Sequence, residues 1–161
     1  MPSRSAASGW LLSLAVLGLA LPAQAASGAL YANARFGYTV QYPADLLVPE
    51  READNADGRQ FHAREGSARL AVWGAYNAES LSPRELAARD MTDCAGGTVS
   101  YRVAKARLIA FSCITPGGQV IYQKTLIRAD VLATVRFDYP LAERARWDPV
   151  VGRVASSLSL N

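Results

Sequence analysis

The sequence predicts an α+β fold in which a largely antiparallel β-sheet is flanked by helices. Several segments alternate apolar and polar residues with a period of two, which is typical of strands with one buried face. Short turns join these segments in pairs, and consecutive hairpins form antiparallel sheets. Two other segments carry apolar residues at helical spacing, so we expect their helices to cover the faces of the sheet.

The first 25 residues have the three parts of a cleavable signal peptide. Arg4 gives a positive start, residues 10–21 form an apolar run of 12 residues, and Ala23-Gln24-Ala25 supplies the small-residue pattern that signal peptidase cuts. A membrane-spanning helix needs about 20 apolar residues. We therefore expect cleavage after Ala25, export to the periplasm or the medium, and a product without a membrane span.

Without these 25 residues, 136 of the 161 residues remain, which suits one domain with one core. We expect residues 26–35 to be a flexible lead-in and residues 36–161 to form a single α/β domain. This part has 16 basic and 14 acidic residues and therefore a net charge of +2. It contains no basic run with interleaved aromatic residues, so nucleic acid is not an expected partner.

Three strands and a long loop are expected in the first half of the domain. Aromatic residues alternate with small or polar residues over 36–42, and Pro43 ends this strand. Residues 44–59 contain five acidic residues and turn-forming residues, which predicts a loop. Short strands over 60–64 and 69–73 follow, joined by a turn.

Two helices are expected. Ser82 can cap the first helix, Pro83 suits the first helical position, and Glu85 completes a capping box. The second helix is expected to begin at Asp148-Pro149 and to continue with apolar residues at helical spacing as far as Leu158.

Four strands arranged as two hairpins are expected between the helices. A turn centred on Ala106 would pair Tyr101 with Phe111 and place the apolar residues of that hairpin, with Cys113, on one core-facing side. The second hairpin is expected to turn at Ala129-Asp130. The four strands are expected near residues 99–103, 109–113, 120–126 and 131–139.

The segment from Phe36 to Asp45 (FGYTVQYPAD) resembles the opening of PsbP-like domains, an aromatic-Gly-aromatic strand that ends in Tyr-Pro. The long loop, the later hairpins and the closing helix are also similar to that group. The resemblance implies an α/β/α sandwich, which the group shares with Mog-type Ran-binding proteins. It also implies a non-enzymatic accessory or binding domain, since plant members assist a photosynthetic complex and Mog-type members bind a GTPase. Within the group, the chain is similar to small exported bacterial proteins of unassigned function.

Cys94 and Cys113 are the two cysteines of the chain. An even number of cysteines in an exported protein indicates a disulfide, which would contribute about 3 kcal/mol for a loop of this length. Two buried free thiols or a redox role are the alternatives, although the spacing is not the C-x-x-C of thiol oxidoreductases. The pair is not part of the PsbP-like pattern, so a bridge would be a local addition.

The sequence contains no recognisable catalytic or metal-binding motif. His62 is the only histidine, and its alternation with Phe61 points it to solvent or a cleft, in a structural or a proton-transfer role. One histidine and two cysteines are too few for a zinc site, and residues 54–58 do not fit EF-hand spacing. Nucleophile-elbow, P-loop and dinucleotide-binding motifs are missing. We therefore expect no enzyme activity, no cofactor and no metal.

Arg59, His62, Arg64 and Arg69 form the candidate contact surface. Arginines beside a hairpin either protect an edge strand or bind an anionic partner. The sequence thus predicts an exported, non-enzymatic accessory or binding domain of the cell envelope that binds a protein or an envelope component. One alternative is a hydrolase of envelope material, which needs two converging acids in a cleft or an acid beside His62. Another is a small secreted enzyme inhibitor with a rigid exposed loop near residues 115–119.

Overall fold

The structure is a computed structural model that describes residues 28–161, so the predicted signal peptide lies outside the described residues. The strands are β1 (Gly28–Asn33), β2 (Tyr38–Pro43), β3 (Leu47–Pro49), β4 (Gly58–Ala63), β5 (Arg69–Tyr76), β6 (Thr98–Lys105), β7 (Leu108–Ile114), β8 (Gln119–Arg128), β9 (Val131–Pro140) and β10 (Ser159–Leu160). The helices are α1 (Pro83–Asp90) and α2 (Arg144–Ser157), with 3-10 turns at Thr92–Cys94 and Leu141–Glu143.

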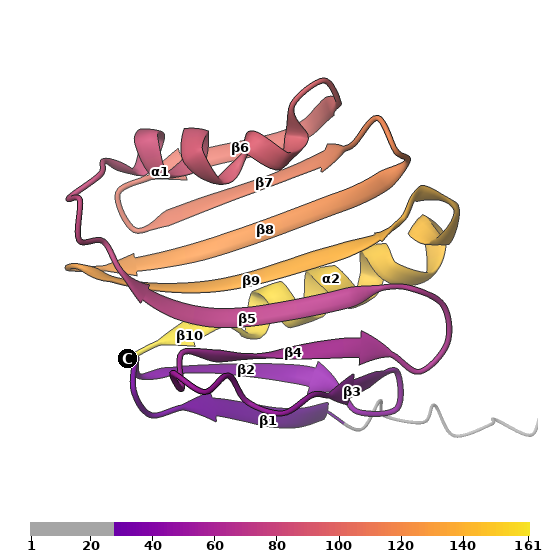
Figure 1. Cartoon of the computed structure of the whole chain (residues 1–161), viewed down its shortest axis with the longest axis horizontal. Helices are drawn as coiled ribbons and strands as arrows, with labels where there is room; N and C mark the ends of the chain where they lie inside the picture. Colours follow the sequence, from indigo (N-terminus) through magenta and orange to yellow (C-terminus); the bar gives the residue numbers. More distant parts are fainter. Residues whose placement is uncertain (1–27) are drawn as a thin grey trace, which may run out of the picture.

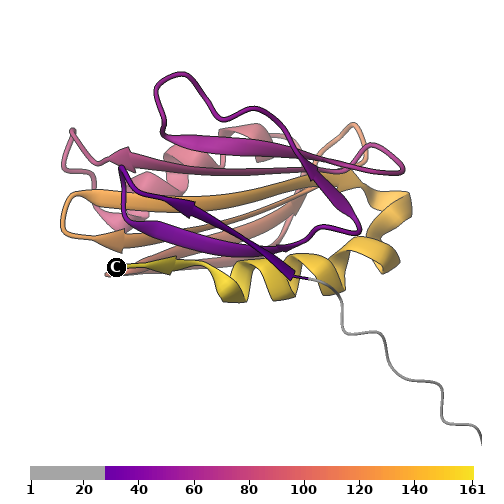
Figure 2. The ribbon, with the colours of Figure 1, turned by 90° about the horizontal axis from the view of Figure 1, so that it is seen from below.

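A seven-stranded antiparallel sheet with the order β3-β4-β5-β9-β8-β7-β6 divides the molecule into layers (Figure 1). Helix α1 lies on one face, over β6 and β7. Helix α2 and a small sheet of order β1-β2-β10 lie on the opposite face, as the second view shows (Figure 2). This arrangement confirms the predicted α+β class and the α/β/α layering.

Helix α1 covers one end of the large sheet, whereas on the other face α2 lies over the central strands β8 and β9, beside the small sheet. On the α2 side, the main core joins β4, β5 and β9 to α2 and the small sheet, and its largest buried side chains include Trp147, Tyr38, Phe61 and Phe137. On the α1 side, a smaller core joins Leu86 of α1 to β7 and β9. In the described chain, each end of the sheet is therefore covered on one face and open on the other.

Helix α1 begins as the sequence predicts. The Ser82 hydroxyl accepts a hydrogen bond from the Glu85 backbone N–H at 3.3 Å, and the Glu85 carboxylate accepts one from the Ser82 backbone N–H at 2.8 Å. Pro83 occupies the first helical turn. The predicted second hairpin is also confirmed, because Arg128 pairs with Val131 across the turn.

The prediction of a flexible lead-in over residues 26–35 is wrong where the structure describes it. Gly28–Asn33 forms β1 and pairs along its whole length with β2. Tyr31 and Asn33 point inward and are buried, whereas Leu30 is 64% exposed. The small residues of this segment alternate only weakly between apolar and polar types, so the sequence did not predict a strand. The strand forms because β2 pairs with it and the buried Tyr31 stabilises it. The predicted loop over 44–59 is similarly interrupted by β3, which pairs with β4.

The β6–β7 register differs from the prediction by one residue. A two-residue turn at 106–107 makes Tyr101 pair with Ser112 instead of Phe111. A bulge between Val99 and Tyr101 restores the predicted pairing at the far end of the hairpin. Directly paired residues share a face, so Tyr101 and Phe111 lie on opposite faces of the sheet, and Tyr101 is 47% exposed.

Helix α2 begins at Arg144, four residues before the predicted start, and contains Pro149. Proline removes one backbone hydrogen bond from a helix interior. The helix forms nonetheless because Trp147 is fully buried and an ion pair at 2.9 Å joins Arg144 to Asp148 one turn later. Tertiary packing thus overrides the local start signal.

Two glycines should respond oppositely to alanine. A Cβ at Gly74 would lie 2.3 Å from Cγ of Phe36, so we expect Gly74→Ala to lower the free energy of unfolding by about 1–3 kcal/mol. A Cβ at Gly152 would meet nothing within 4 Å, so Gly152→Ala should raise it by up to about 1 kcal/mol through helix propensity. Urea unfolding measures both variants. A Gly74→Ala protein as stable as the wild type would contradict the contact with Phe36.

Candidate functional site

A groove between α2 and strands β6–β9, here called the tyrosine groove, is the candidate site. Its walls are Tyr101, Tyr122 and Tyr139 from the sheet and Arg144, Asp148 and Val151 from α2. The groove exists because α2 lies over β8 and β9 and leaves the same face of β6 and β7 uncovered. Its volume of about 310 Å³ lies at the lower end of the range for small-ligand sites.

Phenol groups and one ion pair set the chemistry of the groove. The Tyr139 hydroxyl donates to the Asp148 carboxylate at 2.7 Å, and Arg144 binds the same carboxylate at 2.9 Å. Burial, followed by the hydrogen bond to Asp148, raises the pKa of Tyr139 above its usual value. Burial also raises the pKa of Tyr122. Both phenols therefore remain protonated near neutral pH and present flat, partly apolar surfaces.

The groove continues along α2 toward the end of the helix. A second hollow of about 220 Å³ shares Tyr101 and Tyr122 with the first and reaches Lys124. The Lys124 ammonium donates to the Ala155 carbonyl oxygen at 2.6 Å, where a cation is favourable at a helix C-terminus. Burial lowers the pKa of Lys124.

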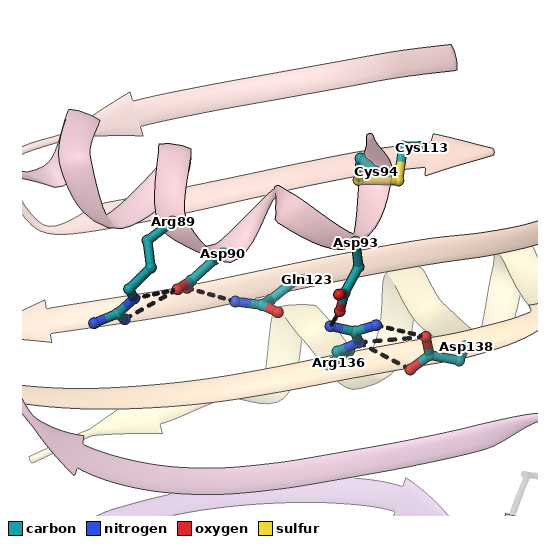
Figure 3. Close-up of polar contacts among 8 residues, drawn as sticks. All are labelled: Arg89, Asp90, Asp93, Cys94, Cys113, Gln123, Arg136 and Asp138. Atoms are coloured by element: carbon teal, nitrogen blue, oxygen red, sulfur yellow. Dashed lines mark hydrogen bonds and ion pairs between the residues drawn. A yellow bond between two sulfur atoms is a disulfide. The ribbon is translucent and has the colours of Figure 1, made fainter. Parts of the chain in front are cut away.

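A polar network on the opposite face holds α1 and the turn after it against the sheet (Figure 3). Asp90 accepts a hydrogen bond from the buried Gln123 at 2.7 Å. Arg136 binds Asp93 at 2.6 Å and Asp138 at 2.9 Å. Burial would lower the pKa of Arg136, but the two carboxylates outweigh it and raise this pKa. These groups satisfy one another, which indicates a structural role.

The predicted disulfide is present and reinforces that attachment. Cys94 in the turn after α1 is bonded to Cys113 on β7, with 5.9 Å between their Cα atoms. Both cysteines are buried beside Phe111 and Ile121. No cysteine in the described chain is free.

The structure separates Arg59 from the other residues of the predicted contact surface. Arg59 lies on the same side of β4 as Phe61, 3.4 Å from the Glu52 carboxylate, with its guanidinium 5.1 Å from the centre of the Tyr31 ring. Arg64 donates to the Ala44 carbonyl oxygen at 3.1 Å. These two arginines therefore support the β1–β4 region through local contacts.

His62 and Arg69 do lie together, since they pair across β4 and β5. Glu50 lies beside both, 3.4 Å from Nδ1 of His62 and 3.9 Å from the Arg69 guanidinium. The side chains of His62 and Glu50 are 49% and 38% exposed. In the described chain no serine or cysteine hydrogen-bonds to this pair, and their role in contacting a partner stays a prediction.

Two kinds of feature are absent from residues 28–161. No group of three or more His, Cys, Asp and Glu side chains in this range could hold a metal ion. None of the helices described is both long and apolar enough to cross a membrane.

Sequence reasoning missed the tyrosine groove. It assigned Tyr101 to the core-facing side of the first hairpin, with Phe111, and the actual register of β6 places Tyr101 at an open edge instead. The groove needs residues from four strands and a helix, so no local motif encodes it. The length of the β6–β7 turn could have indicated the face on which Tyr101 lies. A two-residue turn places Tyr101 on the face opposite Phe111.

Stability should fall at alkaline pH because burial raises the pKa of four tyrosines above the usual value near 10. These tyrosines are Tyr31, Tyr38, Tyr122 and Tyr139. Above pH 10 the unfolded chain releases phenolic protons that the folded chain retains, so the contribution is complete below pH 10 and is lost as the pH rises further. The lowered pKa of Lys124 makes stability rise with pH below about pH 10.5. This effect comes from one group, whereas four tyrosines contribute to the alkaline decline.

Urea unfolding at several pH values, with phenolate absorbance recorded in parallel, measures this effect. Tyr38→Phe should flatten the alkaline decline. Native protein in which all seven tyrosines ionise together near pH 10 would contradict the prediction.

Comparison with known proteins supports the fold. The sequence matches no protein-family model and no curated protein. The solution structure of cyanobacterial PsbP (CyanoP) from Synechocystis sp. PCC 6803 matches with a TM-score of 0.63, covering 90% of this chain and 99% of that chain. The sequence identity is 14%, so the likeness concerns the fold alone. The chain thus has a PsbP-like fold, as the Phe36–Asp45 segment suggested.

Proposed function

We propose that this chain is an exported, non-enzymatic binding domain of the cell envelope, and that a protein partner docks in the tyrosine groove. Residues 1–25 support export, and the disulfide is typical of an oxidising compartment. The part that follows the signal peptide acts as one domain. The PsbP-like fold agrees with an accessory role, as the resemblance implies.

The observation that carries this proposal is the open tyrosine groove itself. Tyrosine is enriched at protein interfaces because it contributes a large contact area and a hydroxyl with little loss of conformational freedom. Tyr101 is 47% exposed at the rim of the groove, and Tyr122 and Tyr139 line the groove beside it. Exposed aromatic side chains grouped at a concave surface mark an interaction site.

A pull-down from envelope extract with immobilised residues 26–161 tests the proposal. We expect reproducible capture of a protein, and Tyr101→Ala should weaken that capture about tenfold or more, the effect of an interface hot spot. Leu30→Ala is the matched control, because Leu30 is an exposed apolar side chain on β1, away from the groove. Absence of any partner, or equal capture by Tyr101→Ala, would count against the proposal.

One observation favours the hydrolase alternative, namely Glu50 beside His62. A His–carboxylate pair can transfer protons, but it needs a nucleophile or a positioned water and protection from solvent. The test is turnover of envelope polymer by purified protein, with His62→Ala as the comparison. Turnover that disappears in His62→Ala would replace the binding proposal, and we expect none.

A further inference from the structure

We infer that β6 is a docking edge, and that the partner segment bound there is an extended, acidic polypeptide that adds to the large sheet as a further strand. This inference deepens the proposed binding function and rests on it. It concerns the strand at the rim of the tyrosine groove and specifies the conformation and charge of the segment that binds.

The first observation is the free edge. In the described part of the chain, β6 pairs with β7 alone, and seven of its eight residues are exposed. The other edge strand of the large sheet, β3, has three residues and ends in Pro49, which suits an edge that should not be extended. Within the large sheet, β6 is therefore the edge with a long row of backbone groups available for another strand.

The second observation is apolar exposure along the same edge. Charged side chains such as Arg102 and Lys105 can protect an edge strand from unwanted pairing. Protection does not explain why Val99 and Tyr101 are nearly half exposed beside them. The bulge between those two residues interrupts the edge, so the stretch suited to pairing is 101–105. Along it, Tyr101 and Val103 share the groove side of the sheet, where apolar side chains of an added strand would pack.

The third observation is charge. Residues 94–129 contain five basic residues and no acidic residue, and none of the five lies within ion-pair distance of a carboxylate in the described chain. They are Arg102, Lys105, Arg107, Lys124 and Arg128. Most other arginines of the described chain are paired. The resulting excess of positive charge attracts an acidic segment and repels a second copy of the same edge.

The test uses a synthetic peptide of alternating glutamate and valine, (Glu-Val)₄, added to residues 26–161. Fluorescence anisotropy measures affinity, and amide hydrogen exchange measures protection along β6. We expect binding that weakens with salt, together with slower exchange in residues 101–105. The peptide (Lys-Val)₄ should not bind. A (Glu-Val)₄ peptide with N-methyl groups on alternate residues keeps the charge but cannot form a ladder, and it should bind about tenfold or more weakly.

Charge reversal in the protein gives a second readout. Arg102→Glu/Lys105→Glu should weaken peptide binding about tenfold or more, whereas Arg84→Glu/Arg153→Glu should change it less than about twofold. Both variants have the same net charge, and Arg84 and Arg153 are exposed and outside ion pairs in the described chain. Thermal unfolding checks that each variant is folded.

Three results would overturn the inference. They are no binding of (Glu-Val)₄, equal binding of the N-methylated peptide, and equal losses of binding in both charge-reversed variants. If a partner is still captured through Tyr101 in the pull-down, the proposed function stands and strand addition alone fails. If capture and peptide binding both fail, the binding function itself is wrong.

Discussion

Replacing Trp147 with alanine is expected to lower the free energy of unfolding by about 3–5 kcal/mol, the range for large aromatic residues removed from cores. The indole is fully buried in the main core, and its Nε1–H donates to the Glu143 carboxylate at 2.9 Å. The substitution leaves a cavity under α2 and removes that hydrogen bond. Urea unfolding followed by circular dichroism measures the loss.

Two comparisons make the result specific. Trp147→Phe retains most of the apolar volume and should lose less stability than Trp147→Ala. Leu141 is 41% exposed just before α2, so Leu141→Ala should change stability by less than about 0.5 kcal/mol. If Trp147→Ala and Leu141→Ala had similar effects, the packing of α2 against the sheet would be wrong.

Removing the disulfide is expected to lower the free energy of unfolding by about 3 kcal/mol, because Cys94 and Cys113 are 19 positions apart and the bridge restricts the unfolded chain. Cys94→Ala/Cys113→Ala should also increase hydrogen exchange in α1, whose attachment it weakens. The main core around Trp147 should keep its slow exchange until global unfolding.

Reduction of the wild-type protein provides the matched control for the double substitution. The reduced protein keeps both buried sulfur atoms, so its loss of stability reports the cross-link, and any additional loss in the alanine variant reports packing around Phe111 and Ile121. Equal stability of the oxidised and reduced proteins would contradict the prediction.

Local signals predicted much of the fold. The capping box at Ser82 and Glu85 located the start of α1, and the alternation over 131–139 located β9 with the correct partner register. These features depend on contacts between residues close in sequence. The sequence did not predict β1 or the correct start of α2, because these elements depend on long-range contacts. Tyr31 and Trp147 pack against residues far along the chain.

The candidate site was less accessible to such reasoning. The arginines grouped in sequence are divided in space, with Arg59 turned toward Tyr31 and away from His62. The tyrosine groove depends on a one-residue choice of register at β6, which moves Tyr101 from one face to the other. A single sequence contains little that decides between two such registers.

The two ends of the large sheet are packed by different elements, with α1 over β6 and β7 and the small sheet over β4 and β5, so the molecule has two separately packed ends. Strands β6 and β4 are separated by four strands, a span of about 24 Å at the usual interstrand spacing. Substitutions at these two ends share no packing partners, so their effects on stability should add. One end could therefore diversify under selection while the other, with its own half of the core, remained unchanged.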